Sequence, residues 1–204
     1  MKDSTLNSRP LALTMLVVVL FTCGMFWLNR SDVPLGYAHY EKYGFSLLYP
    51  KLTNVHEEGL SIGLGSEPSD LIGLVQWQSY WEGKLEIFEV IWLVTSRASN
   101  TQAELDRFVA MISQPNVVIR SVGEPFMASL HGEEVECTYI EVEQAGNAFS
   151  GVIGVVYQPW SSPGLDRVYF VVYATFRGSL TDEQLRDSFQ TYLDGFTINE
   201  PKCL

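Results

Sequence analysis

The stretch VYFVVYATF, residues Val168–Phe176, is apolar at nearly every position, which predicts a strand that is buried on both faces. A similar run, Val152–Tyr157, precedes it, and the loop QPWSSPGLD joins the two. Strands of this kind lie in the middle of a sheet because other elements cover them on both sides. We therefore expect these two strands to form the centre of the fold.

Two amphipathic helices are predicted to supply that cover. The segment Ser99–Ser113 has an apolar stripe and a Thr-x-x-Glu capping box that starts at Thr101, and a proline follows it. The segment Thr181–Asp194 has a second stripe and a Thr-x-x-Gln box, with a glycine at its exit. One helix on each face would enclose the sheet.

Further strands, linked mostly by hairpins, fill the rest of the chain. They are predicted at Tyr43–Tyr49, Leu71–Tyr80, Lys84–Thr95, Val117–Val122, Phe126–Leu130 and Glu133–Glu143. In the last of these the apolar residues change parity, which predicts a β-bulge near Tyr139–Ile140. The whole pattern predicts an α+β fold, with an antiparallel β-sheet between helical layers (an α/β/α sandwich).

The N-terminal region contains an uncharged stretch, LALTMLVVVLFTCGMFWL, at Leu11–Leu28. A helix of this length reaches roughly 27 Å, close to the ~30 Å hydrocarbon core of a bilayer. Lys2 and Arg9 precede the stretch and Arg30 follows it, so the excess positive charge favours a cytoplasmic N-terminus. The sequence predicts one transmembrane helix, and hence a single-pass protein of the cell membrane whose C-terminal domain is extracytoplasmic.

This interpretation divides the chain into four parts. They are a cytoplasmic N-terminus (1–10), a transmembrane helix (11–28), a linker (29–38) and a soluble domain (39–204). A lipoprotein signal, with Cys23 as the lipidated residue, is the alternative for the N-terminal part. Either anchor makes the lipid bilayer a partner of the chain.

Acidic residues dominate the predicted soluble domain. From Ser31 onward there are 23 Asp and Glu against 10 Lys and Arg, and the whole chain has a formal net charge of −11. Such a surface repels the phosphate backbone of nucleic acids, so we expect no nucleic-acid binding. It suits a basic partner, although its simplest effect is to keep a tethered domain soluble.

The cysteines do not form a disulfide framework or a zinc motif. Cys137 and Cys203 are the two outside the apolar N-terminal stretch, and in an oxidising compartment they would be able to form a disulfide. The other interpretation is that Cys137 is a buried small hydrophobic residue and that Cys203 lies in a loose tail.

Signatures of catalysis are missing from the sequence. It contains neither the GxSxG nor the HExxH motif, and we expect no cofactor and no enzymatic activity. The densest group of metal-ligand types is His56, Glu57 and Glu58, a weak candidate because neighbouring residues in a strand point to opposite faces.

Aromatic residues are the stronger candidates for binding. Trp77, Tyr80 and Trp81 lie near the tip of the first predicted hairpin, and Trp160 lies in a proline-flanked loop. Exposed tryptophan and tyrosine often anchor protein interfaces. The alternative is that Trp77 and Trp81 fold back onto the sheet.

The segment YGFSLLYP, Tyr43–Pro50, resembles the opening strand of the PsbP/Mog1-like superfamily. The order of the capped helix, the strands and the final helix also agrees with that family over roughly residues 40–198. The resemblance implies a binding or assembly factor rather than an enzyme. Members assist the photosystem in oxygenic phototrophs or bind a small GTPase in fungi, but a shared fold does not carry either partner to this chain.

Together these features predict a membrane-anchored, extracytoplasmic binding or accessory module that acts with a protein partner, in the assembly or stability of a membrane complex. The alternatives are a small metal-dependent enzyme or hydrolase with a site on the sheet, and a purely structural envelope domain.

Overall fold

The computed structural model describes residues 36–51, 53–59, 67–81, 83–96, 100–112, 117–144 and 146–199. The predicted transmembrane helix (11–28), Cys23 and Cys203 lie outside these ranges. Among the helices of the described ranges, none has the length and apolar character needed to cross a membrane.

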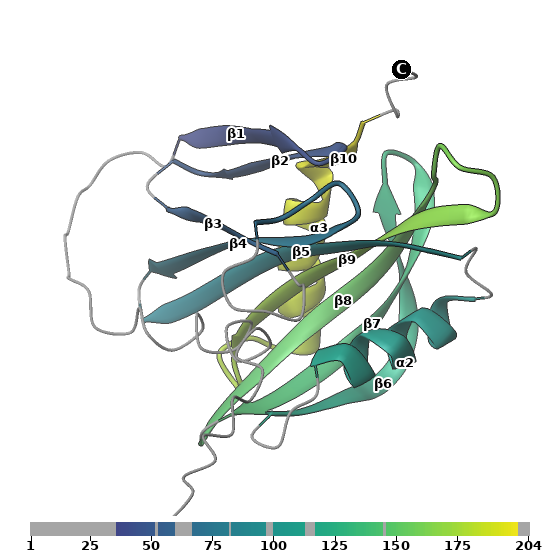
Figure 1. The fold of residues 1–204 in the computed structure, drawn as a ribbon. Helices are drawn as coiled ribbons and strands as arrows, with labels where there is room; N and C mark the ends of the chain where they lie inside the picture. Colours follow the sequence, from purple (N-terminus) through teal and green to yellow (C-terminus); the bar gives the residue numbers. More distant parts are fainter. Residues whose placement is uncertain are drawn as a thin grey trace, which may run out of the picture.

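The main element is an antiparallel seven-stranded sheet with the order β3-β4-β5-β9-β8-β7-β6 (Figure 1). Its strands are β3 (Val55–Glu58), β4 (Ile72–Trp81), β5 (Lys84–Ser96), β6 (Val117–Leu130), β7 (Glu133–Gln144), β8 (Asn147–Pro159) and β9 (Leu165–Phe176). The two continuous apolar runs form β8 and β9 at the centre of the sheet. This confirms the prediction made from them.

The two described helices cover opposite faces of this sheet. In Figure 1, α2 (Thr101–Ile112) lies in front of the sheet and α3 (Asp182–Asp194) behind it. Alternate residues of β9 point to the two sides: Phe170 packs with Phe108 of α2, whereas Tyr173 shares a core with Phe189 of α3. The α/β/α arrangement is therefore confirmed.

A second, three-stranded sheet lies on the α3 side and was not predicted. It has the order β1-β2-β10 and consists of β1 (Tyr37–Lys42), β2 (Phe45–Pro50) and β10 (Phe196–Ile198). A tight turn joins β1 to β2, with positive φ angles at Tyr43 (50°) and Gly44 (78°), as a two-residue hairpin loop requires. Because β1 begins at Tyr37, the end of the predicted linker belongs to a strand.

Polar side chains begin both helices, but one cap differs from the prediction. The capping box of Thr181 and Gln184 is present at α3. At α2, Thr101 is already helical, and the Asn100 side chain caps the helix by accepting a hydrogen bond from the Ala103 N–H (2.8 Å).

The predicted β-bulge at Tyr139–Ile140 of β7 was wrong. β7 pairs with β8 in continuous register across these residues, and the irregularity lies in β6, between Val122 and Phe126. The change of parity has another cause. Cys137 and Tyr139 face the core under α3, whereas Ile140 faces the core under α2, so different faces of the strand are covered along its length.

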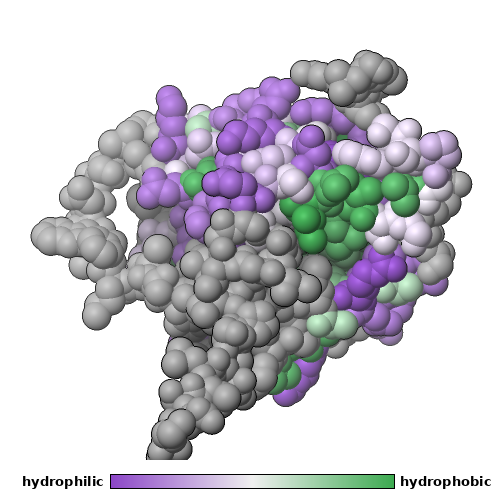
Figure 2. All heavy atoms as spheres, viewed as in Figure 1, coloured by the Kyte–Doolittle hydropathy of each residue, from purple (hydrophilic) through white to green (hydrophobic). Residues whose placement is uncertain are grey.

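The surface on the side shown in Figure 2 is largely hydrophilic around β1 and β2, as the net charge predicts. A compact apolar area lies between this region and α2 in the same view. Apolar atoms make up a large share of the surface of most folded proteins, so this area alone does not define a function.

Candidate functional site

Trp77 is one of the predicted interface aromatics, and it lies in the core. It is 1% exposed, and its ring contacts Tyr192 of α3 with a centroid distance of 4.7 Å. In β4 it has the same parity as Val75, which belongs to the same core cluster. The position in the strand therefore turns Trp77 toward α3, and it does not face a partner.

The other aromatic candidates differ in their surroundings. Tyr80 is 68% exposed near the end of β4 and remains available for contacts. The Trp81 side chain is not among the side chains that the structure describes. Trp160 is half-buried and stacks on a buried arginine, with Cζ of Arg167 lying 4.0 Å from the centre of its ring.

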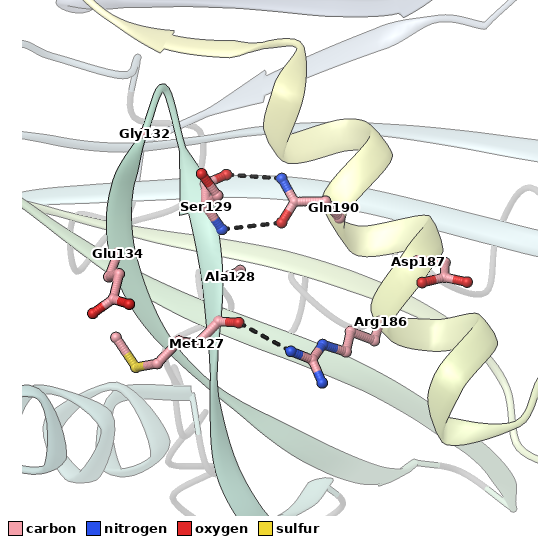
Figure 3. Close-up of a pocket in the computed structure, with 8 residues that line it drawn as sticks. All are labelled: Met127, Ala128, Ser129, Gly132, Glu134, Arg186, Asp187 and Gln190. Atoms are coloured by element: carbon pink, nitrogen blue, oxygen red, sulfur yellow. Dashed lines mark hydrogen bonds between the residues drawn. The ribbon is translucent and has the colours of Figure 1, made fainter.

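A groove lies between α3 and the β6–β7 hairpin (Figure 3). Its volume is about 450 Å³, and it is open to solvent. The residues that line it are Met127, Ala128, Ser129, Gly132, Glu134, Arg186, Asp187 and Gln190. Sequence patterns missed it because its two walls come from segments far apart in the chain.

The floor of the groove is the free edge of β6, which is an outer strand of the large sheet. The Gln190 side chain binds the main chain of Ser129 twice: its Nε2 donates to the carbonyl (2.8 Å), and its Oε1 accepts from the N–H (3.0 Å). Arg186 Nη2 donates to the Met127 carbonyl (3.3 Å). Figure 3 shows these contacts, in which side chains of α3 occupy groups that would otherwise bind another strand.

Charged and polar side chains line the α3 wall of the groove. Met127 is 44% exposed, but its side chain points away from α3 (Figure 3), because its parity in β6 is opposite to that of Ala128 and Leu130 in the core under α3. Arg186 lies over the ring of Phe126, with Cζ 4.8 Å from the ring centre.

Replacing Gln190 by alanine is expected to lower the free energy of unfolding by about 1 kcal/mol, since two hydrogen bonds to the β6 edge are lost. The exposed edge should also promote concentration-dependent association. Urea unfolding and sedimentation velocity measure the two effects. Gln102→Ala is the matched control, because Gln102 and Gln190 each also bind an aspartate four residues along their helix. Equal behaviour of the two variants would contradict the prediction.

The predicted metal candidates His56, Glu57 and Glu58 do not converge. Glu57 binds Lys42 (2.8 Å) and the Tyr43 hydroxyl (3.1 Å), whereas His56 and Glu58 lie together on the other face of β3, with 3.7 Å between Nε2 and Oε2. Within the described ranges, no group of three histidine, cysteine, aspartate or glutamate side chains is arranged to hold a metal ion. Alternation along the strand separates the three residues.

Two buried polar residues lie beside this pair and were not identified from the sequence. Gln76 of β4 is directly opposite His56 on one side and opposite Glu89 of β5 on the other. Gln76 is 2% exposed and Glu89 7% exposed, and Gln76 Nε2 and Glu89 Oε1 have no hydrogen-bond partner. The sequence feature that could have revealed them is the charged residue Glu89 inside the apolar run of β5.

Burial also changes the protonation of this group. Desolvation, assisted by the negative charge of Glu58, raises the pKa of Glu89 to about 8. Desolvation raises the pKa of Glu58 as well, against the opposing attraction of His56. Perturbed carboxyl groups of this kind are common at functional sites, although structural networks also produce them.

Cys137 lies in the core under α3. Its thiol is fully buried and donates to the Val135 carbonyl (3.4 Å), and burial raises its pKa to about 12. Cys203 is outside the described residues, so the disulfide between the two cysteines stays a prediction.

Comparison with known proteins gives no family model and no curated protein that matches. The similar solved structures include the two that follow. The cyanobacterial PsbP (CyanoP) of Synechocystis sp. PCC 6803 has a TM-score of 0.47 and 13% identity, over 85% of this chain and 98% of that one. LpqN of Mycobacterium tuberculosis, described as involved in cell envelope biogenesis, has a TM-score of 0.45 and 14% identity, over 83% and 92%.

Proposed function

We propose that this chain is a membrane-anchored, extracytoplasmic accessory module that binds a protein partner through the groove between α3 and the β6–β7 hairpin. The membrane part of the proposal rests on the uncharged stretch Leu11–Leu28 and on the positive charges before it. The binding part rests on the groove. In this proposal the membrane anchor holds the groove close to other membrane proteins, and the groove binds one of them.

The observation that carries the binding proposal is the edge of β6. Its main-chain groups at Met127 and Ser129 are covered by flexible side chains of α3 and not by another strand. Arg186, Asp187 and Gln190 of α3 line the groove beside these groups. A partner strand that displaces these side chains has the main-chain donors and acceptors of β6 within reach.

The membrane part is tested by cell fractionation of the full-length chain. We expect it to sediment with membranes, to resist extraction by alkaline carbonate and to be released by detergent. A variant that lacks residues 2–30 should be soluble. Full-length chain in the supernatant of detergent-free lysate would contradict the proposal.

The binding part is tested with a photo-crosslinking amino acid at position 186 of α3, in the native membrane, because the exposed Arg186 side chain lines the groove and reaches the edge of β6. The matched control places the same residue at Thr191, which is also exposed on α3 and is not among the lining residues. We expect one discrete adduct from position 186 and none from position 191. Equal crosslinking at both positions, or none at position 186, would argue against the groove.

A further inference from the structure

The sheet face opposite α3 carries a group of polar side chains near its β3 edge. Glu58 and His56 come from β3, Gln76 from β4 and Glu89 from β5. The strand register places Gln76 between His56 and Glu89 in one row across the sheet. We call Glu58, Gln76 and Glu89 the acid–amide cluster. It is on the other side of the sheet from α3 and is separate from the groove.

Two atoms of this cluster indicate that a ligand group is missing. Gln76 Nε2 and Glu89 Oε1 are buried without a hydrogen-bond partner, although both belong to side chains that are more than nine-tenths buried. Buried polar atoms in folded proteins nearly always have a partner, because an unmet hydrogen bond is costly. Glu89 Oε1 is an acceptor that requires a donor, and the Gln76 amide on the neighbouring strand presents a second acceptor beside it once its oxygen and nitrogen are exchanged.

From this arrangement we infer that the acid–amide cluster binds a guanidinium group, with Glu58 and Glu89 as its carboxylate acceptors and the Gln76 amide beside them. A guanidinium is planar and carries five N–H donors, which lets it bridge acceptors on different strands. Its positive charge offsets the repulsion between the two carboxylates. The amide of Gln76 presents its oxygen to the ligand after a flip that exchanges its oxygen and nitrogen.

A guanidinium fits better than a divalent metal ion. Metal ions require several ligands at short, fixed distances, and the described residues offer no group of three suitable side chains. An organic cation needs only two acceptors and tolerates a wider spacing. The acidic chain, with a net charge of −11, would also attract cations toward this face.

Binding of a cation to the acid–amide cluster should depend on pH. Glu89 must lose its proton to bind a cation, and the titratable groups facing it among the described residues are Glu58 and His56 of β3. Affinity should therefore rise with pH, by up to tenfold per unit, until Glu89 is ionised. Replacing Glu89 by glutamine should remove this dependence.

The test is calorimetric titration of the full-length chain in detergent micelles between pH 6 and 9. The probes are agmatine, the peptide acetyl-Gly-Arg-Gly-amide and the same peptide with neutral citrulline in place of arginine. Binding of agmatine supports a free small cation as the natural ligand, and binding of the arginine peptide alone supports a side chain of a polypeptide. Citrulline should bind at least tenfold more weakly than arginine.

The variants Glu89→Gln and Glu58→Gln should each weaken binding at least tenfold at pH 9, and circular dichroism checks that both are folded. Glu57→Gln is the matched control, since Glu57 lies on the opposite face of β3 and should leave binding unchanged. The inference is overturned if neither cation binds saturably, if citrulline binds equally, or if Glu89→Gln and Glu58→Gln bind like the unmodified chain. Saturable Mn²⁺ binding that depends on Glu89, without agmatine binding, would identify a metal site and also overturn it.

Discussion

Replacing Arg167 by alanine is expected to lower the free energy of unfolding by about 3–5 kcal/mol. The guanidinium is buried, and it donates to the Tyr43 carbonyl (2.7 Å), the Asp70 carbonyl (2.6 Å) and the Tyr169 hydroxyl (3.3 Å). It also stacks on Trp160. Without it, two main-chain carbonyls lose their donor and the stacked ring loses its partner.

The effect should be large because Arg167 joins separate parts of the fold. Tyr43 lies in the turn between β1 and β2, Asp70 precedes β4, and Arg167 itself belongs to β9. The side chain therefore ties the three-stranded sheet to the seven-stranded sheet. Arg167→Lys keeps the charge but has one nitrogen in place of a planar fork, so we expect an intermediate loss.

Urea unfolding followed by tryptophan fluorescence measures these changes. Arg120→Ala is the control: its side chain is exposed, and its distance to a Glu143 oxygen is 4.0 Å, so it should change stability by about 0–1 kcal/mol. An Arg167→Ala variant as stable as Arg120→Ala would show that the buried contacts are not needed.

The parts of the fold that sequence predicts are those encoded locally. Continuous apolar runs identify β8 and β9, and capping residues with an apolar stripe identify α2 and α3. The three-stranded sheet could not be found in this way. Its β10 has only three residues, and Phe196 pairs with Leu47, so the pairing depends on contacts between distant segments.

The candidate sites show the same limit. Trp77 and Tyr80 are close in sequence, but their different parity in β4 makes one buried and the other exposed. Charged residues in strands are normally assigned to the solvent face, and Glu89 breaks this rule. The groove and the acid–amide cluster each combine residues from distant segments, which spacing alone does not bring together.

Replacing Glu89 by glutamine is expected to stabilise the domain above pH 8 by about 5 kcal/mol and to change little below pH 5. The pKa of Glu89 rises from an ordinary value of 4.5 to about 8 on folding. Between these values the folded chain holds a proton that the unfolded chain has lost. Its contribution to stability is complete below about pH 4.5 and declines as the pH rises toward 8, by up to ~1.4 kcal/mol per unit.

The measurement is the free energy of urea unfolding of both chains from pH 5 to 9, without added cations. The difference between the two chains isolates Glu89, because the other ionisable groups are common to both. Glu58→Gln should show a difference of the same sign, since burial raises the pKa of Glu58 too. Glu57→Gln should show no such gain at high pH, because Glu57 has Lys42 and Tyr43 as hydrogen-bond donors. A Glu89→Gln chain that is less stable than the unmodified chain at pH 9 would mean that the carboxylate is ionised and stabilised in the folded protein, which requires a positive partner bound to it.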